Sequence, residues 1–317
     1  MKTPIKLGAY GLVLTTVFAG AVAVGSAVGP VSGGESHPTR AAADRGHRDR
    51  MNMGQTPGMN PQRSRKSAMP GMAHNSGPEG LAASANGYTL SPTATILPTG
   101  TTTSFTFRIL GPDGTALTAF TPEHEKELHF IVVGRDLTGY QHLHPTRAAD
   151  GTWSVPLRVP SAGAYKAFAD FQPVGHNTPM TLAVDLSAPG AFTPASLPAT
   201  GTTATVDDYH VSLTGRLVPG QESELTFTVV KDGRPVTDLQ PYLAAYGHLV
   251  ALRVGDLAYL HVHPDGAPGD GHTPSGPQIV FHADVLTPGP YRLFLDFRHG
   301  DVVRTAELTV IAAKEAP

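Results

Sequence analysis

Residues 246–264 read YGHLVALRVGDLAYLHVHP, with an apolar run on either side of Gly255 and Asp256. Short runs of apolar, β-branched and aromatic residues joined by a glycine-containing pair are typical of a β-hairpin with a two-residue turn. We therefore expect Val254 to pair with Leu257 and the two runs to form neighbouring antiparallel strands.

Three histidines of this hairpin fall on one face. In the register set by the turn, His248 lies opposite His263, with Cβ atoms about 4.5–5.5 Å apart, and His261 points to the same side because side chains alternate along a strand. A slip of one residue would separate His248 from the other two histidines. Because Val250 and Leu252 share this face, we expect the histidines at one end of a buried surface.

The hairpin pattern occurs twice in the chain, which indicates an internal duplication. Residues 113–145 align with residues 232–264 at a constant offset of 119, and residues 165–171 align with residues 291–297 after an insertion of 7 residues. The equal spacing predicts a matching trio in the first copy, His129, His142 and His144. The identities at the offset of 119 are Asp113/Asp232, Gly114/Gly233, Thr118/Thr237, Pro122/Pro241, His129/His248, Tyr140/Tyr259, His142/His261, His144/His263 and Pro145/Pro264.

The rest of the duplicated region also favours strands. Short runs separated by turn residues, at roughly 8–12-residue spacing, are typical of β-sandwiches. We predict an all-β fold with two tandem immunoglobulin-like β-sandwiches, at residues 88–186 and 204–312, joined by a linker at residues 187–203. The expected strands are 103–110, 128–133, 139–144, 152–159 and 164–171 in the first copy, and 225–230, 248–254, 257–263, 278–285 and 291–297 in the second.

Composition excludes several classes of protein. The chain has 317 residues, no cysteine, 23 Lys and Arg and 26 Asp and Glu, for a formal net charge of -3. No overall basic field is present for binding nucleic acid. Without cysteine there are no disulfides, thiolate zinc sites or iron–sulfur clusters, so any metal site must use histidine, methionine, carboxylate or backbone ligands. The 15 histidines are the unusual feature of the composition.

The first 30 residues read as a targeting segment. Lys2 and Lys6 precede an uncharged, largely apolar run of 23 residues at 7–29. A run of this length can span a bilayer as an anchor, since about 20 residues suffice, and it is longer than the core of a usual signal peptide. We predict a signal anchor, or alternatively a cleaved signal peptide, at residues 1–30. Either places the rest of the chain outside the cytosol, attached to the membrane or secreted.

Residues 31–87 are predicted to be a disordered linker, because they are rich in Gly, Pro, Ser and Asn and show no period that could bury a core. Thioether sulfur suits Cu(I), so methionines clustered in an exported segment indicate transient capture of copper, although methionine is also tolerated anywhere in an unstructured tail. The residues concerned are Met51, Met53, Met59, Met69, Met72 and His74.

The two histidine trios are the candidate metal ligands. Three neutral imidazoles on a rigid hairpin can bind Cu(II) or Zn(II) and leave an open coordination position. Copper is preferred over zinc because imidazole and thioether occur in one exported chain. In the alternative interpretation, the domains form a structural or protein-interaction module whose histidines only stabilise the fold. The recurring Asp170 and Asp296 would orient an imidazole or pair with Lys or Arg, while His124, His210, His272 and His282 have no counterpart in the other copy.

No catalytic motif supports an enzyme. In residues 124–129 the two histidines are five apart, whereas a zinc protease helix requires four, and neither a nucleophile elbow nor a phosphate-binding loop occurs. We therefore expect a non-enzymatic metal-binding protein. A metal-dependent hydrolase that uses the open coordination position is a third, weaker interpretation.

With its N-terminal segment, methionine-containing linker and two His-x-His-Pro units, the chain resembles actinobacterial exported or membrane-anchored tandem-domain proteins labelled heavy-metal-associated or secreted proteins. The likeness rests on residues 246–253, 260–264 and 291–297. It implies a role in handling copper or other heavy metals outside the cytosol. A looser similarity in kind links the chain to CopC-type copper-resistance proteins, which are small exported β-sandwiches. None of that family's ligands is carried over, because no histidine is shown to begin the mature chain.

Overall fold

The structure is a computed structural model that describes residues 78–314. Within this range every regular element is a β-strand, and no helix there is long and apolar enough to cross a membrane. The strands form four sheets, two for each copy of the duplicated sequence. The prediction of an all-β fold with two tandem immunoglobulin-like sandwiches is therefore confirmed.

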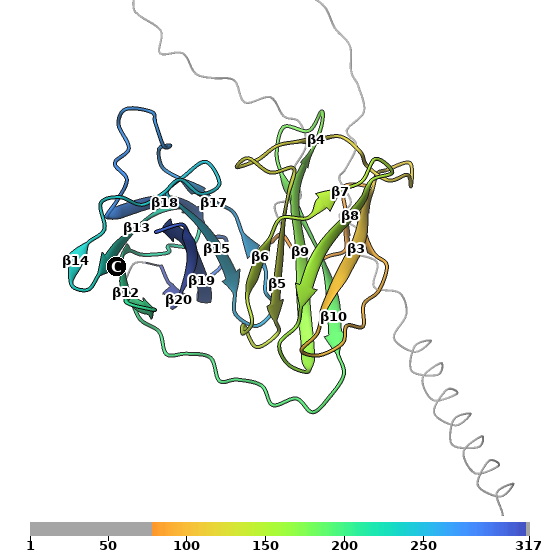
Figure 1. Cartoon of the computed structure of the whole chain (residues 1–317), viewed down its shortest axis with the longest axis horizontal. Coiled ribbons are helices and arrows are strands. Elements are labelled where there is room, and N and C mark those ends of the chain that lie inside the picture. The colour runs from red at the N-terminus through yellow and green to blue at the C-terminus, as the bar shows by residue number, and fades with distance from the viewer. Residues whose placement is uncertain (1–77, 315–317) are drawn as a thin grey trace, which may run out of the picture. The chain divides into compact units, whose positions relative to one another are not determined.

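The first sandwich consists of two antiparallel sheets (Figure 1). One has the strand order β1-β2-β3-β8-β7, and the other has the order β10-β9-β5-β6, with β4 paired to β9. The strands are β1 (Ser84–Ala85), β2 (Tyr88–Pro92), β3 (Thr102–Leu110), β4 (Phe120–Thr121), β5 (Leu128–Gly134), β6 (Gln141–Leu143), β7 (Thr146–Arg147), β8 (Thr152–Arg158), β9 (Gly163–Pro173) and β10 (Met180–Ala188).

The second sandwich repeats this arrangement. Its sheets have the orders β11-β12-β13-β18-β17, with β14 paired to β13, and β16-β15-β19-β20. The strands are β11 (Thr203–Val206), β12 (Tyr209–Gly215), β13 (Glu222–Lys231), β14 (Arg234–Pro235), β15 (Gly247–Arg253), β16 (Tyr259–Leu260), β17 (Val262–Pro264), β18 (Gln278–Asp284), β19 (Gly289–His299) and β20 (Val302–Ala312).

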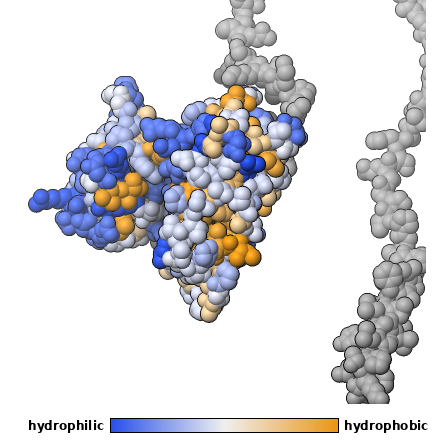
Figure 2. Space-filling model, turned by 45° about the vertical axis from the view of Figure 1, so that its right-hand side comes forward, coloured by the Kyte–Doolittle hydropathy of each residue, from blue (hydrophilic) through white to orange (hydrophobic). Residues whose placement is uncertain are grey.

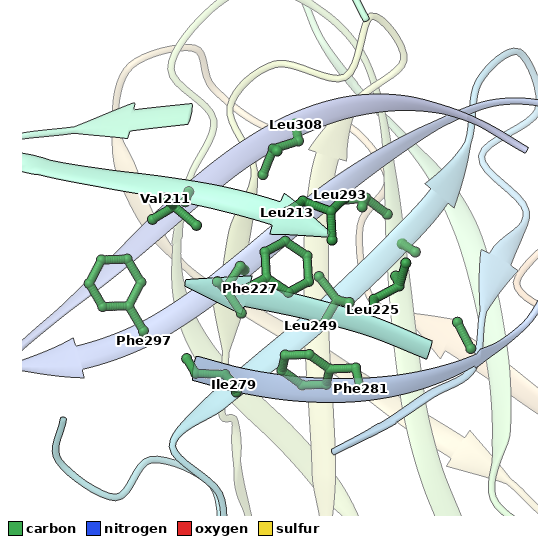
Figure 3. Close-up of a cluster of buried hydrophobic side chains, with 14 of the residues drawn as sticks. Val211, Leu213, Leu225, Phe227, Leu249, Ile279, Phe281, Leu293, Phe297 and Leu308 are labelled. Carbon is green, nitrogen blue, oxygen red and sulfur yellow. The ribbon is translucent and has the colours of Figure 1, made fainter. Parts of the chain in front are cut away.

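Each sandwich has its own hydrophobic core between its two sheets. Along β3, for example, Phe105, Phe107 and Ile109 are buried while Arg108 between them is exposed, as expected for a strand with one face turned to the core. Figure 3 shows the corresponding core of the second sandwich, where side chains of the two sheets meet. The labelled residues are Val211, Leu213, Leu225, Phe227, Ile279 and Phe281 from one sheet and Leu249, Leu293, Phe297 and Leu308 from the other.

Each sandwich also contains a tyrosine corner, a feature of immunoglobulin-like domains. The hydroxyl of Tyr165 donates to the carbonyl oxygen of Ser161 at 2.8 Å, and that of Tyr291 donates to the carbonyl oxygen of Thr287 at 3.0 Å. Both tyrosines lie near the start of the strand that carries the repeated aspartate. The corner therefore helps to fix the strands on which Asp170 and Asp296 stand.

The start of the first sandwich differs from the expected boundary. The predicted linker extends to residue 87, but residues 78–87 include β1 and pack against both sandwiches. The amide of Gly80 donates to the carbonyl oxygen of Thr181 at 3.1 Å, and the amide of Tyr259 donates to the carbonyl oxygen of Glu79 at 2.9 Å. Backbone hydrogen bonds of this kind leave no periodic pattern of side chains in the sequence. The composition of the stretch therefore led to the prediction that it belongs to the linker. The anchor or signal at residues 1–30 and the linker up to residue 77 lie outside the described residues.

The two sandwiches contact each other through the sheets that contain β5 and β15. Strand β5 is buried along its whole length because alternate residues face its own core and the other sandwich. The second set of side chains forms a third hydrophobic cluster with contributions from both copies. Its buried members are Ile131, Val133, Leu137, Phe168 and Ala183 from the first sandwich and Val250, Leu252, Leu257, Tyr259 and Phe294 from the second.

Hydrophobic residues on the surface are dispersed. On the face that Figure 2 shows, they lie in separate small groups among hydrophilic residues. Exposed apolar side chains such as Ile96, Val174 and Leu286 come from different loops. Isolated exposed residues of this kind are normal for a globular protein.

Candidate metal centre

Strands β5 and β6 bring three histidines of the first sandwich together. Ile131 on β5 pairs with His142 on β6, and the same register places His144 opposite His129. One ring nitrogen from each of the three histidines lies within 4.8 Å of those of the other two. Among residues 78–314, this is the one group of three or more His, Cys, Asp or Glu side chains whose spacing suits a metal ion.

Two of these rings each have one nitrogen committed to an oxygen acceptor. Nε2 of His129 donates to the carbonyl oxygen of Glu123 at 3.0 Å, and Nδ1 of His142 lies 2.9 Å from Oδ2 of Asp296. The remaining nitrogens, Nδ1 of His129 and Nε2 of His142, face each other at 3.0 Å. A neutral imidazole has one N–H and one lone pair, so both lone pairs point into this contact. A positive charge, either a proton or a metal ion, is needed between them.

The third ring leaves a nitrogen without a partner. Nε2 of His144 is buried and makes no hydrogen bond within the described part of the chain. Leaving a buried polar atom unsatisfied costs about 1–3 kcal/mol. A metal ion bound between the three rings would satisfy this nitrogen and the two facing lone pairs at once.

Burial keeps two rings of the trio in the neutral form. Burial, and after it the proximity of His142, lowers the pKa of His129 to about 3 and that of His144 to about 3. Neutral imidazole is the form that coordinates transition metals. His129 and His144 are therefore in the ligand form at neutral pH.

The carboxylate behind His142 comes from the other sandwich. Asp296 lies on β19, and the side chains of His142 and Asp296 are only 2% and 3% exposed. Oδ1 of Asp296 accepts a hydrogen bond from Oγ1 of Thr305 at 2.6 Å, which leaves Oδ2 for the imidazole. Such a carboxylate fixes the tautomer and the orientation of a ligating histidine. The sequence predicted this role for Asp296, but not that the histidine belongs to the other copy.

Two more histidines adjoin the trio. The ring of His248, from β15, stacks on that of His129 with centroids 5.2 Å apart and lies 4.7 Å from that of His142. The ring of His124 lies 5.6 Å from that of His248. Burial is the largest cause that lowers the pKa of His248 and of His124. The centre is therefore a cluster of largely neutral imidazoles shared between the sandwiches.

His124 was not expected to take part. It lies in a tight turn, with φ at 48°, closed by backbone hydrogen bonds in both directions between Glu123 and Lys126. The matching turn of the second copy also has positive φ, 56° at Leu243. The turn was thus duplicated but its histidine was not, so a comparison of the two copies gave no signal for His124.

The second copy arranges its histidines differently. β16 follows the expected register, with Ala251 opposite Leu260, but the chain then crosses to the other sheet, where His263 pairs with β18. The predicted pairing of His248 with His263 is therefore wrong, and His248 lies opposite Asp296. The physical reason is that the strand after the hairpin leaves its partner two residues earlier than in the first copy. The structure thus does not repeat the compact trio of His129, His142 and His144 in the second copy.

His261 is engaged by a carboxylate from outside its own sandwich. Its Nε2 lies 2.8 Å from Oε2 of Glu79. Burial by itself lowers the pKa of His261, but the hydrogen bond to Glu79 and the charges of Asp170 and Glu79 outweigh it and raise the pKa to about 9. Although burial works to raise the pKa of Glu79, the bond to His261 lowers it. The two side chains form an ion pair at neutral pH.

A cavity of about 120 Å³ lies between the two groups of histidines. Residues of both sandwiches line it, which makes it a polar chamber at their junction. The titratable residues of its wall are Glu123, His124 and Asp170 from the first sandwich and His248, Tyr259, His261 and His263 from the second.

Two other histidines stabilise tyrosines. Nε2 of His176 lies 2.9 Å from the hydroxyl of Tyr88, and Nδ1 of His299 lies 2.6 Å from the hydroxyl of Tyr209. These pairs occupy corresponding places in the two copies. His176 follows β9 and His299 is the last residue of β19, and their contacts give both histidines a structural role. The methionines of the predicted linker and His74 lie outside the described residues.

Comparison with known proteins identifies a family. A family model described as "Domain of unknown function (DUF8832)" matches residues 83–188 and again residues 204–314. The two matches correspond to the two sandwiches and together cover more than half of the chain. Comparison with curated proteins finds no match.

Solved structures show only distant similarity. The Escherichia coli adhesin FdeC is 17% identical with a TM-score of 0.24, covering 72% of this chain and 65% of that chain. A putative membrane anchored protein from Corynebacterium diphtheriae is 10% identical with a TM-score of 0.21, covering 73% and 60%. Tandem immunoglobulin domains of titin are 11% identical with a TM-score of 0.19, covering 72% and 97%. The chain thus spans less than two thirds of the first two proteins.

Proposed function

Because the chain belongs to the DUF8832 family, which is described only as a domain of unknown function, we propose its function from the site itself. The protein binds a transition-metal ion, copper in preference to zinc, between His129, His142 and His144. It acts outside the cytosol, held to the membrane or secreted through residues 1–30, in metal handling or resistance. It is a binding protein and not an enzyme.

The observation that carries this proposal is the contact of 3.0 Å between Nδ1 of His129 and Nε2 of His142. Two nitrogens bound to one ion at about 2.0–2.1 Å lie about 2.9–3.4 Å apart, so the observed distance suits ligation without rearrangement of either ring. Both outer N–H groups are held by oxygen acceptors, and the buried Nε2 of His144 supplies a third lone pair.

The ligand types favour copper or zinc. Imidazole suits both ions, whereas the chain has no cysteine thiolate to offer. Copper is preferred because five methionines occur at residues 51–72 of the same chain, and thioether sulfur is a ligand for Cu(I). In this proposal the methionines collect copper and the histidines retain it.

Titration of the full chain with Cu(II) at pH 7, followed by equilibrium dialysis, tests the proposal. The double variant His142→Ala with His144→Ala should bind one ion fewer than the parent chain. The control is His210→Ala, an exposed histidine on β12 whose Nδ1 lies 3.1 Å from Oγ1 of Thr205. Repeating the titration with Zn(II) establishes the preference between the ions. Unchanged stoichiometry in the double variant would overturn the proposal.

A second candidate function is a structural or interaction module, in which the histidines only hold the sandwiches together. The observation in its favour is that His129 has both ring nitrogens in contact with partners, Glu123 and His142. In this case the double variant would lower the free energy of unfolding of the metal-free protein and leave the number of bound ions unchanged. The two functions therefore predict opposite results from the same variant.

A further inference from the structure

A short segment crosses from one sandwich to the other beside the second group of histidines. We call residues 79–82 the strap. The amide of Gly80 donates to Thr181 of the first sandwich, while the carbonyl oxygen of Glu79 accepts from the amide of Tyr259 in the second. The strap therefore covers the free edge of β16, next to the residues at which the chain crosses from β16 to β17 in the other sheet.

The strap lies close to the protein beneath it. Gly80 has φ at 67°, and a Cβ atom at this position would come within 2.8 Å of the Phe168 ring and 2.9 Å of Cβ of Tyr259. Only glycine fits this conformation and this space without strain. The backbone of the strap thus presents the side chain of Glu79 to His261 at a defined place.

The two copies show what Glu79 changes. His261 corresponds to His142, Asp170 to Asp296, and Thr181 to Thr305. In both copies the threonine donates to Oδ1 of the aspartate, at 3.1 Å for Asp170 and 2.6 Å for Asp296.

The histidines, however, bind different carboxylates. His142 contacts Asp296 through Nδ1, so its Nε2 faces the trio, whereas Nε2 of His261 is taken by Glu79 at 2.8 Å. The nitrogen that Glu79 occupies is the one that, in the first copy, points toward the candidate metal.

We propose that His248, His261 and His263 form a second metal site in the cavity of about 120 Å³, and that Glu79 keeps this site closed. Withdrawal of Glu79 lets Nδ1 of His261 turn to Asp170, as His142 is turned to Asp296, and frees Nε2 for an ion. The inference rests on the proposed function, because His248, His261 and His263 are the counterparts in the sequence of His129, His142 and His144.

The arrangement of the other ligands supports this assignment. The rings of His261 and His263 are parallel, with 4° between their planes and centroids 6.3 Å apart. His248, His263 and Asp170 all line the same cavity as His261. The three histidines and the aspartate that would orient His261 therefore border one cavity.

The test compares the number of Cu(II) ions bound by the full chain and by Glu79→Ala at pH 7, by equilibrium dialysis with a weak competing chelator. Ions bound elsewhere in the chain cancel in the difference. We expect Glu79→Ala to bind one ion more than the parent chain. Adding His263→Ala to Glu79→Ala should remove that extra ion. Circular dichroism checks that each variant is folded.

The matched control is Glu222→Ala, which removes another Glu–His pair, that of Glu222 with His282 at 3.5 Å. It should leave the stoichiometry unchanged. Equal stoichiometry in Glu79→Ala and the parent chain would overturn the inference, as would an extra ion that survives the loss of His263. Either result leaves the proposed function intact, because that depends on the separate loss of one ion in the variant of His142 and His144.

Discussion

Nδ1 of His142 in the first sandwich lies 2.9 Å from Oδ2 of Asp296 in the second, and both side chains are almost fully buried. A carboxylate of one copy thus orients an imidazole of the other. The candidate metal centre is complete only when the two sandwiches are docked, so binding of an ion and docking of the domains stabilise each other.

Asp296→Asn should weaken Cu(II) binding without removing a ligand. The amide can still accept a hydrogen bond from Nδ1 of His142, but it lacks the charge that raises the basicity of the ring, and loss of such a partner typically costs about 10–100-fold in affinity. Competition with a chelator of known affinity measures the change. Asp301→Asn, at an exposed pair with Arg298, is the control. Equal affinities for Asp296→Asn and the parent chain would show that Asp296 does not support a metal ligand.

Replacement of His144 should separate metal binding from stability. Since Nε2 of His144 has no hydrogen-bond partner, His144→Ala should leave the thermal stability of the metal-free protein nearly unchanged and abolish most of its rise on adding Zn(II). His129→Ala loses contacts with Glu123 and His142, so it should also destabilise the metal-free protein, by about 0.5–1.5 kcal/mol for each lost bond. Thermal unfolding with and without Zn(II) distinguishes these outcomes. If Zn(II) raised the thermal stability of His144→Ala as much as that of the parent chain, His144 would not be a metal ligand.

Local patterns in the sequence predicted much of the fold. The alternation around Gly255 predicted the hairpin, and its register is present where Ala251 faces Leu260. The turn itself is wider than expected: the amide of Arg253 donates to Ala258 and that of Leu257 to Arg253, so Val254 does not pair with Leu257. Asp256 stabilises this wider turn by accepting from the amide of Ala258.

Contacts between the copies could not be read from strand periodicity, because that pattern reports only which residues share a face of one sheet. His142 and Asp296 are 154 positions apart in the sequence. Glu79 of the strap and His261 are 182 positions apart. One signal was present: residues 130–133 are apolar without alternation, which is typical of a strand buried on both faces. It indicates a covering partner but not its identity.

The turn after β15 should contribute stability that depends on pH. The hydrogen bond from Arg253 is the largest cause that holds the pKa of Asp256 below its ordinary value of 3.8. Because the folded pKa lies below the unfolded one, the stabilisation is fully present above about pH 3.8 and is lost as pH falls through the folded value. The carboxylate is partly exposed, so we expect at most about 1 kcal/mol.

Urea unfolding of the parent chain and of Asp256→Asn measures this effect. The difference in free energy of unfolding between them should be largest at pH 7 and should become smaller as the pH falls below about 3.8. A difference that stays constant over this range would mean that the charge of Asp256 does not contribute and that only its hydrogen bonds matter.

Phe294 should link the docking of the sandwiches to metal affinity. Its ring stacks on that of Tyr140 in the other sandwich, with centroids 4.0 Å apart and 5° between the planes. Phe294→Ala should cost about 3–5 kcal/mol of stability, as for other buried aromatic residues, and should also weaken Cu(II) binding because Asp296 lies two residues further along the strand. Phe281→Ala, in the core of the second sandwich alone, should cost a similar amount of stability. If both variants lowered the Cu(II) affinity equally, general destabilisation would explain the effect, whereas a loss confined to Phe294→Ala ties the metal centre to the junction of the two copies.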